Sequence, residues 1–337
     1  MRTRSVSSAG VATLIVLFAV APGTAAGQGT TAPGARRIAP TAAPADTPTY
    51  TPPRTPDGQP DISGLYIGLT APGAVEAPLV PIPQRDRSLL GGEFSFNLNE
   101  RPPLPEGAAR RPLVVDPPDG KIPLQPWALE KRKEIIANQD KLEYLDGRVL
   151  CLPPGLPRTN LPAPVVGYQI FQKPGYVVIF YEQSHLYRII PLDGRPHLHP
   201  KVRMAMGDSR GHWEGNTLVV EATNFTTTFP IQNWVAGTAS VPEGVPAESL
   251  STGHGIPRSE AYRVVERFIP IDAERIRYEA TIEDPKIFTQ PWKMSWDAFT
   301  RAPADYVPVE YACHEGNANN LQLMLGVDIT RVRVDVP

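Results

Sequence analysis

The chain has 337 residues, 41% of them hydrophobic, which is enough to bury a sizeable core in one large domain or two small ones. Lysine and arginine (33 residues) nearly balance aspartate and glutamate (35 residues). This balance, without a basic run, excludes nucleic acid as an expected partner and does not favour an anionic lipid surface. We therefore expect the partner to be a small-molecule ligand or substrate, or another protein.

The first 26 residues have the three parts of a secretory signal peptide. Arg2 and Arg4 give a positive start, residues 9–21 form a short apolar run, and small residues lead up to Ala26. That run is too short for a stable membrane-spanning helix, and no later segment has 18 consecutive apolar residues. The sequence predicts a secreted or periplasmic protein with no membrane span after cleavage. The alternative is a short anchor that is kept.

Residues 27–57 contain mainly alanine, proline, threonine and glycine, and they are predicted to form a disordered tether. A single β-rich domain is expected over residues 58–337. It starts with a Pro-Asp-Gly turn that leads into a strand containing Gly64 and Tyr66. A proline-rich insertion over residues 71–126 follows, and then a helix is predicted over residues 126–138. The apolar side of this helix is expected to comprise Trp127, Ile135 and Ile136.

Strands dominate the pattern after Leu150. Residues 176–181 and 186–191 are apolar runs, and residues 212–222 predict a hairpin around a Glu-Gly-Asn turn. Residues 261–268, 275–283 and 292–296 alternate between apolar and polar side chains, and a last strand is predicted over 306–313.

Alternation with one wet face is typical of antiparallel sheet. The predicted fold is all-β: an antiparallel meander forming a barrel (lipocalin- or calycin-like) or a sandwich, with one or two short helices. The chain contains no P-loop and no dinucleotide-binding fingerprint, so no cofactor is predicted.

All six histidines lie between residues 185 and 314, and several have carboxylates nearby. Histidine suits proton transfer near neutral pH, and carboxylates orient it. The predicted catalytic residues are His212 or His185 as base and Glu182 or His314 as acid, with Asp208 orienting the site. The alternative for Glu182 is a surface ion pair with Arg188, and chance clustering is the alternative for the histidines.

Two other chemistries are weighed in the same region. His197 and His199 have the spacing of a metal-binding pair on a strand, but no third ligand follows, so solvated loop histidines are favoured and no metal is predicted. Ser209 matches Gly-x-Ser-x-Gly, but a hairpin follows it where a nucleophile elbow needs a helix. An ion pair between Asp208 and Arg210 is the preferred interpretation there.

Substrate binding is assigned to polar and aromatic side chains near these groups. Arg210 and Asn224 are expected to orient a substrate, and aromatic residues to line a cavity, although packing of the sheet is their alternative role. The predicted binding residues are Arg210, Asn224, Tyr181, Trp213, Trp292 and His254.

The two cysteines, Cys151 and Cys313, are compatible with a disulfide in an exported protein, or with two free buried thiols. Pairing requires Cα atoms within disulfide reach, which the sequence does not show.

Several segments together resemble a large uncharacterised family of exported bacterial proteins that is abundant in acidobacteria. The resemblance spans residues 52–325 and implies an envelope location and one β domain, but it assigns no catalytic residues. The segments are TPDGQPDISG (55–64), CLPPG (151–155), MGDSRGHWEG (206–215), SE (259–260), EDP (283–285) and YACHEGN (311–317).

Two hypotheses follow. The first is an exported enzyme that acts on a small organic molecule by acid–base chemistry, as a hydrolase, lyase or isomerase. The second is a non-catalytic β-barrel that binds an apolar or aromatic ligand. Ionisable groups converging in one pocket favour the enzyme, whereas a mostly apolar, aromatic pocket favours the binding protein.

Overall fold

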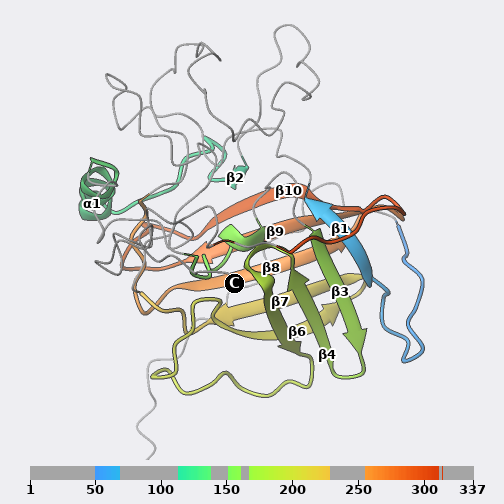
Figure 1. Cartoon of the computed structure of the whole chain (residues 1–337). Coiled ribbons are helices and arrows are strands. Elements are labelled where there is room, and N and C mark those ends of the chain that lie inside the picture. Colours follow the sequence, from blue (N-terminus) through green and yellow to red (C-terminus); the bar gives the residue numbers. More distant parts are fainter. Residues whose placement is uncertain are drawn as a thin grey trace, which may run out of the picture. The chain divides into compact units, whose positions relative to one another are not determined.

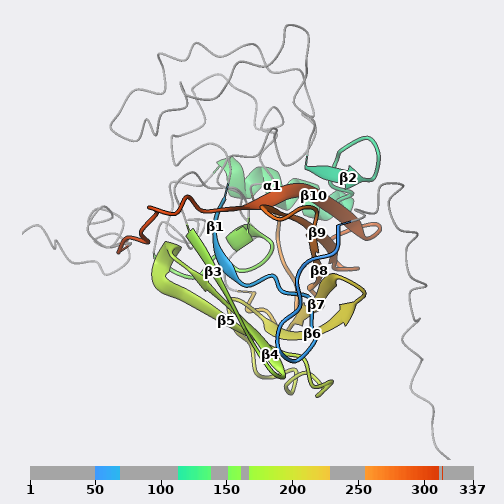
Figure 2. The same cartoon turned by 90° about the vertical axis from the view of Figure 1, so that its right-hand side faces the viewer.

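Nine antiparallel strands form a nearly closed barrel in the computed structural model of the protein (Figures 1 and 2). The structure describes residues 50–68, 113–137, 151–160, 167–227, 255–310 and 313, all within one unit, Pro48–Pro337. The predicted signal peptide and most of the predicted tether lie outside these residues. In the described part, no helix has the length and apolar content to cross a membrane.

The strands follow one another around the barrel almost in chain order. The sheet order is β5-β4-β3-β1-β10-β9-β8-β7-β6, and β2 pairs with β10 off this path. The bounds are β1 (Gly64–Gly68), β2 (Val114–Asp116), β3 (Gly167–Lys173), β4 (Tyr176–Tyr181), β5 (Leu186–Pro191), β6 (Asp208–Glu214), β7 (Thr217–Thr223), β8 (Arg263–Pro270), β9 (Arg275–Glu283) and β10 (Trp292–Arg301). The predicted meander is thus confirmed, and of its two forms the barrel is the one observed.

The barrel has one seam, between β5 and β6. Each of the eight neighbouring pairs along the path is antiparallel, so the two end strands run in the same direction. Side chains close the seam in place of a backbone ladder. A Cβ added to Gly211 would lie 2.7 Å from Cγ2 of Ile190, which shows how closely the two strands approach.

A parallel seam requires the chain to return from the end of β5 to the start of β6. Residues 192–207, here called the crossover, make this return over the outer face of β6 and β7. The backbone N–H of Met204 donates to the carbonyl of Asn224 (2.9 Å), and that of Thr226 donates to the carbonyl of Met204 (3.0 Å). The crossover brings additional side chains onto the outside of the barrel.

The core lies inside the barrel and is rich in aromatic rings. Alternate residues of β9 and β10 point inward, as the sequence pattern predicted, including Tyr278, Trp292 and Trp296. The Phe299 ring meets that of Tyr168 edge-to-face with centroids 4.8 Å apart, and the Trp296 ring meets that of Tyr278 at 4.9 Å. Such ring pairs stabilise the core beyond simple burial of area.

The helices are short. The structure describes α1 (Pro126–Ala137), close to the predicted 126–138, and two 3₁₀ turns, η4 (Arg158–Asn160) and η5 (Gln183–His185). Ala128 and Ile135 of α1 are buried. Trp127, placed on the apolar side by the sequence, is 54% exposed and donates from Nε1 to the carbonyl of Lys286 (3.0 Å).

The predicted strand over residues 306–313 does not form in its described part, residues 306–310. Pro308 has no N–H for a ladder, and a turn joins the N–H of Tyr306 to the carbonyl of Pro303 (3.0 Å). Residues 50–57, at the end of the predicted tether, lie against the barrel. Arg54 donates to Asn216 Oδ1 in the β6–β7 turn (3.0 Å).

Candidate functional site

A fully buried ion pair crosses the interior of the barrel. Arg188 of β5 and Glu266 of β8 both point inward, with side chains 3% and 0% exposed. Arg188 donates from Nη1 to Glu266 Oε1 (3.0 Å) and from Nη2 to Glu266 Oε2, and its Nε donates to Ser209 Oγ across the seam (2.8 Å). Every nitrogen of this guanidinium therefore has a protein partner.

Two more side chains complete this inner cluster, which we define as Arg188, Glu266, Ser209, Tyr278 and Asn160. Tyr278 donates its hydroxyl to Glu266 Oε1 (2.7 Å), and Asn160 of η4 donates from Nδ2 to the same oxygen (2.9 Å). Burial and the neighbouring carboxylate raise the pKa of Tyr278 well above its ordinary value. Burial, the largest single influence, lowers the pKa of Arg188, but the charge and hydrogen bonds of Glu266 together with Tyr181 and Tyr278 outweigh it, and the net shift is upward.

These shifts fix the charges of the inner cluster. Arg188 stays a cation, and Tyr278 stays a neutral donor. Breaking one half of such a buried pair strands the other charge in a medium of low polarity, which costs several kcal/mol. The inner cluster therefore suits a fixed structural element better than a group that exchanges protons.

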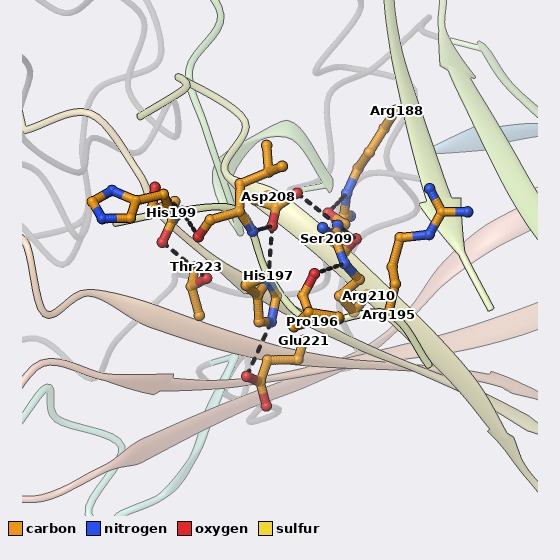
Figure 3. Close-up of polar contacts among 12 residues, drawn as sticks. Arg188, Arg195, Pro196, His197, His199, Asp208, Ser209, Arg210, Glu221 and Thr223 are labelled. Carbon is orange, nitrogen blue, oxygen red and sulfur yellow. Dashed lines mark hydrogen bonds and ion pairs between the residues drawn. The ribbon is translucent and has the colours of Figure 1, made fainter. Parts of the chain in front are cut away.

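A second ionic cluster lies on the outer face of the barrel, where the crossover meets β6 and β7 (Figure 3). His197 of the crossover lies between two carboxylates. Its Nδ1 is 3.0 Å from Oδ2 of Asp208, and its Nε2 is 3.2 Å from Oε1 of Glu221. We call His197, Asp208, Arg210, Glu221 and Arg263 the outer cluster.

Asp208 is the anchored member of the outer cluster. It is 5% exposed and accepts from the backbone N–H of Leu198 (2.8 Å) and from Nη1 of Arg210 (2.6 Å). Burial raises the pKa of Asp208, but the hydrogen bonds from Leu198, His197 and Arg210 outweigh that effect, and the net shift is downward. Asp208 is therefore an ionised carboxylate held in one position against the imidazole.

Two of the predicted binding residues hold the crossover in place. Arg210 donates from Nε to the carbonyl of Pro196 (3.0 Å), and Asn224 donates from Nδ2 to the carbonyl of Leu198 (3.0 Å). Both bonds flank His197 in sequence. Asp208, Arg210 and Asn224 thus do come together, but around His197 and not around His212.

Glu221 links the imidazole to further charges. Its Oε2 accepts from Arg263 (2.5 Å), and Arg263 also pairs with Glu283 (3.0 Å). Burial raises the pKa of Glu221, but Arg263 and His197 outweigh it, and the net shift is downward. Both ring nitrogens of His197 therefore face ionised carboxylates.

The remaining catalytic candidates are dispersed. His212 lies on the outer face of β6, with its side chain 61% exposed and its Nε2 3.2 Å from Oε1 of Glu214. His185 is exposed at the end of η5 and has a positive φ of 47°. His314 and His254 lie outside the described residues. The structure does not bring His212, His185 and Glu182 together with Asp208.

Glu182 is buried, and its two carboxylate oxygens accept hydrogen bonds from the start of β3 and from residues 306–309. It accepts from the backbone N–H of Gly167 (2.5 Å) and of Val309 (2.5 Å), and from the hydroxyl of Tyr306 (2.5 Å). The alternative pairing of Glu182 with Arg188 on the surface is wrong, because Arg188 points into the barrel and binds Glu266.

The predicted aromatic binding residues face the core. Tyr181 and Trp292 are buried in it, and Trp213 packs against it. Burial raises the pKa of Tyr181 to about 12, so its hydroxyl is a proton donor at neutral pH. No protein group accepts from Tyr181 Oη in the part of the chain that is described.

The structure also places the residues of the two other chemistries considered from the sequence, the serine hydrolase and the histidine metal site. Ser209 points inward to Arg188 while His212 points outward, so these two residues form no serine–histidine pair. His197 and His199 lie in the crossover, not on a strand. Within the described ranges no group of three or more His, Cys, Asp or Glu residues is arranged to hold a metal ion.

Cys151 and Cys313 form a disulfide, with Cα atoms 5.8 Å apart. This bond anchors the start of residues 151–160, the segment that carries Asn160 into the inner cluster. Leu156 of this segment accepts a hydrogen bond from the hydroxyl of Tyr262 inside the core (3.0 Å). The Cys-Leu-Pro-Pro-Gly sequence therefore has a structural role in this chain.

A pocket of about 270 Å³ lies beside the β8–β9 turn. Asp61, Arg275 and Arg301 contribute charges to it, and Tyr66 contributes an aromatic ring. Arg301 lies over the Tyr66 ring, 5.1 Å from the centroid, and donates to the carbonyls of Ser63 and Ala273. None of these lining residues was predicted from the sequence to belong to a site.

Comparison with known proteins finds no matching family model, no matching curated protein and no matching solved structure.

Proposed function

We propose that the protein is an exported enzyme that transfers protons on a small organic molecule, with His197 as the acid–base group. One observation carries this proposal: the imidazole of His197 has an anchored, ionised carboxylate on Nδ1, and its Nε2 contacts Glu221, a carboxylate near the surface whose side chain is 38% exposed. The side chain of His197 is 23% exposed, against 7% for Asp208. An imidazole that a buried carboxylate orients close to the surface is a usual arrangement for general acid–base catalysis.

The roles follow from the contacts. Asp208 orients His197 through its contact with Nδ1. Arg210 and Asn224 are positioning residues, because they hold Asp208 and the backbone on either side of His197. Glu221 occupies Nε2 in the free protein, and Arg263 still holds its other oxygen when Glu221 turns away. Nε2 then gives its proton to a substrate atom, or takes one back.

Proton exchange at carbon tests the proposal without knowledge of the substrate. The protein is incubated in D₂O with a pool of small ketones and aldehydes, and deuterium uptake next to the carbonyl is measured by mass spectrometry. We expect uptake above the rate in buffer, and a loss of about 100-fold or more in His197→Gln, because general acid–base groups contribute factors of this size.

His212→Gln is the matched control, since His212 also contacts a glutamate but lacks the buried aspartate. It should retain the exchange rate, and both variants should keep the wild-type melting temperature within a few degrees. Absence of exchange in the wild type, or equal rates in His197→Gln and His212→Gln, contradicts the proposal.

Export is part of the same proposal. The Arg2–Ala26 pattern supports it, and the Cys151–Cys313 disulfide supports it independently, because disulfides persist mainly outside the cytoplasm. We expect protein recovered from the periplasm or medium of an expressing bacterium to begin after Ala26. Recovery only from the cytoplasm, with Met1 retained, contradicts export.

The non-catalytic alternative has a specific location in the pocket beside the β8–β9 turn. Its lining carries carboxylates and guanidinium groups as well as Tyr66. A ligand bound there would have to be polar, which differs from the apolar or aromatic ligand that the sequence favoured.

A further inference from the structure

The outer face of β3, β4 and β5 carries an apolar grid. Cross-strand register places its nine outward side chains in three rows of three. The rows are Lys173, Tyr176 and Pro191; Phe171, Val178 and Ile189; and Gln169, Phe180 and Tyr187. Lys173 is the one charged member, and it lies at a corner. We call these nine residues the outer grid.

The large side chains of the outer grid are exposed to an unusual degree. Tyr187 is 68% exposed, Ile189 54% and Phe171 49%. Three strands and three rows cover about 300 Å² in the plane of the sheet, given the usual strand spacing and rise per residue. Contiguous apolar patches of that size on a monomer are often functional.

The opposite half of the barrel has a different outer face. On β6–β9 the outward positions carry ion pairs, such as Arg267 with Glu214 (2.8 Å) and Arg263 with Glu283 (3.0 Å). A charged partner that covered the outer grid would leave its own charges without water or counter-ions. The occupant must therefore present a large apolar face, and a second copy of the chain carries one.

We propose that the outer grids of two copies pack face to face in a two-fold dimer. An axis parallel to β4 would place Lys173 over Pro191 of the partner subunit, and an in-plane axis across the strands would place it over the partner's Gln169. The two lysines meet in neither arrangement, so neither two-fold packing brings like charges together in the isologous interface.

The area sets the expected strength. Allowing for side-chain relief and for two copies, the dimer buries on the order of 1,000 Å², near the lower limit of specific interfaces. The dimer should therefore be weak and reversible, as interfaces below about 1,200 Å² usually are, and we look for it in the micromolar range. This inference is independent of the chemistry at His197.

Sedimentation velocity over a concentration series tests the dimer with full-length protein. We expect the average mass to rise with concentration toward twice that of one chain. Ile189→Lys should weaken association at least tenfold, because it buries an unpaired charge in the second row of the grid. Val115→Lys on β2 is the matched control, as Val115 is 46% exposed and lies on a strand that pairs with β10. It should associate like the wild type.

Tyr187→Glu provides a second variant at the most exposed position of the grid and guards against misfolding of Ile189→Lys. Circular dichroism checks that each variant keeps the wild-type fold. A wild-type protein that stays monomeric throughout the series overturns the proposal. So does an assembly larger than two chains, or a dimer that both grid variants leave unchanged.

Discussion

The inner and outer clusters both contain arginine and carboxylate side chains, and both include residues of β6. They differ in burial: the inner ion pair is fully buried, whereas the outer cluster is partly exposed. Ser209 belongs to the inner cluster, and its neighbour Asp208 belongs to the outer one, because alternate residues of β6 face opposite sides of the sheet. Inside, Arg188 and Glu266 neutralise one another, and Ser209, Tyr278 and Asn160 take their remaining hydrogen bonds. Outside, Asp208 holds Nδ1 of His197, and Nε2 contacts Glu221, whose side chain is 38% exposed.

The contrast between the two clusters indicates which of them is suited to chemistry on a substrate. Aromatic rings pack in the described interior, and the buried charges of Arg188 and Glu266 there neutralise one another. On the outside, the crossover places His197 against the outward carboxylates Asp208 of β6 and Glu221 of β7. Substitutions in the two clusters should therefore separate stability from activity.

The largest effect is expected from breaking the inner pair. Glu266→Gln leaves Arg188 buried and uncompensated, so the free energy of unfolding should fall by about 3–5 kcal/mol. Urea denaturation measures this loss. The double variant Arg188→Met/Glu266→Gln should recover most of it, because both charges are gone while the Gln carbonyl still accepts from Tyr278 and Asn160. If the double variant has the same low free energy of unfolding as Glu266→Gln, the unpaired charge of Arg188 is not the cause of the instability.

A smaller effect, with a defined pH dependence, is expected in the outer cluster. Asp208→Asn weakens charge-assisted hydrogen bonds and should cost about 1–3 kcal/mol at neutral pH. Because folding lowers the pKa of Asp208, its contribution is complete above the unfolded value of about 3.9 and is lost as pH falls through the folded value. The difference between wild type and Asp208→Asn should therefore shrink below about pH 4.

The smallest effect is expected at His212, which is outward on the same strand. His212→Gln should change the free energy of unfolding by less than about 0.5 kcal/mol, as is usual for exposed positions. Denaturation of both β6 variants at neutral pH and near pH 3 makes the comparison direct. A pH-independent difference for Asp208→Asn would contradict the assignment of Asp208 as the ionised anchor.

The strands were predictable because their signal is local. Alternation over residues 275–283 identified the inward face that contains Tyr278, and the turn residues fixed the β6–β7 hairpin. The alternation in residues 261–268 likewise put Glu266 on the inward side of β8 among apolar residues. A charged residue at an inward position was the one feature of the sequence that could have indicated the inner cluster. Its partner Arg188 comes from the far side of the barrel, which no local pattern specifies.

The outer cluster was less accessible to sequence reasoning. Asp208, Arg210 and Asn224 were identified, but the histidine they surround was assigned to a solvated loop. His197 reaches Asp208 only because β5 and β6 end up parallel and the crossover packs on the outer face. That placement depends on the closure of the whole barrel. The spacing of His197 and Asp208 in the sequence therefore does not predict their contact. Glu221 was missed for the same reason.

Chemical rescue tests the role of His197 most directly. His197→Ala is assayed for deuterium uptake into the carbonyl pool with and without free imidazole, and imidazole without protein gives the background. If His197 is the acid–base group, uptake falls by about 100-fold in His197→Ala and imidazole restores part of it in a saturable manner. Uptake equal to the wild type without imidazole, or no response above the background, would show that His197 does not transfer the proton.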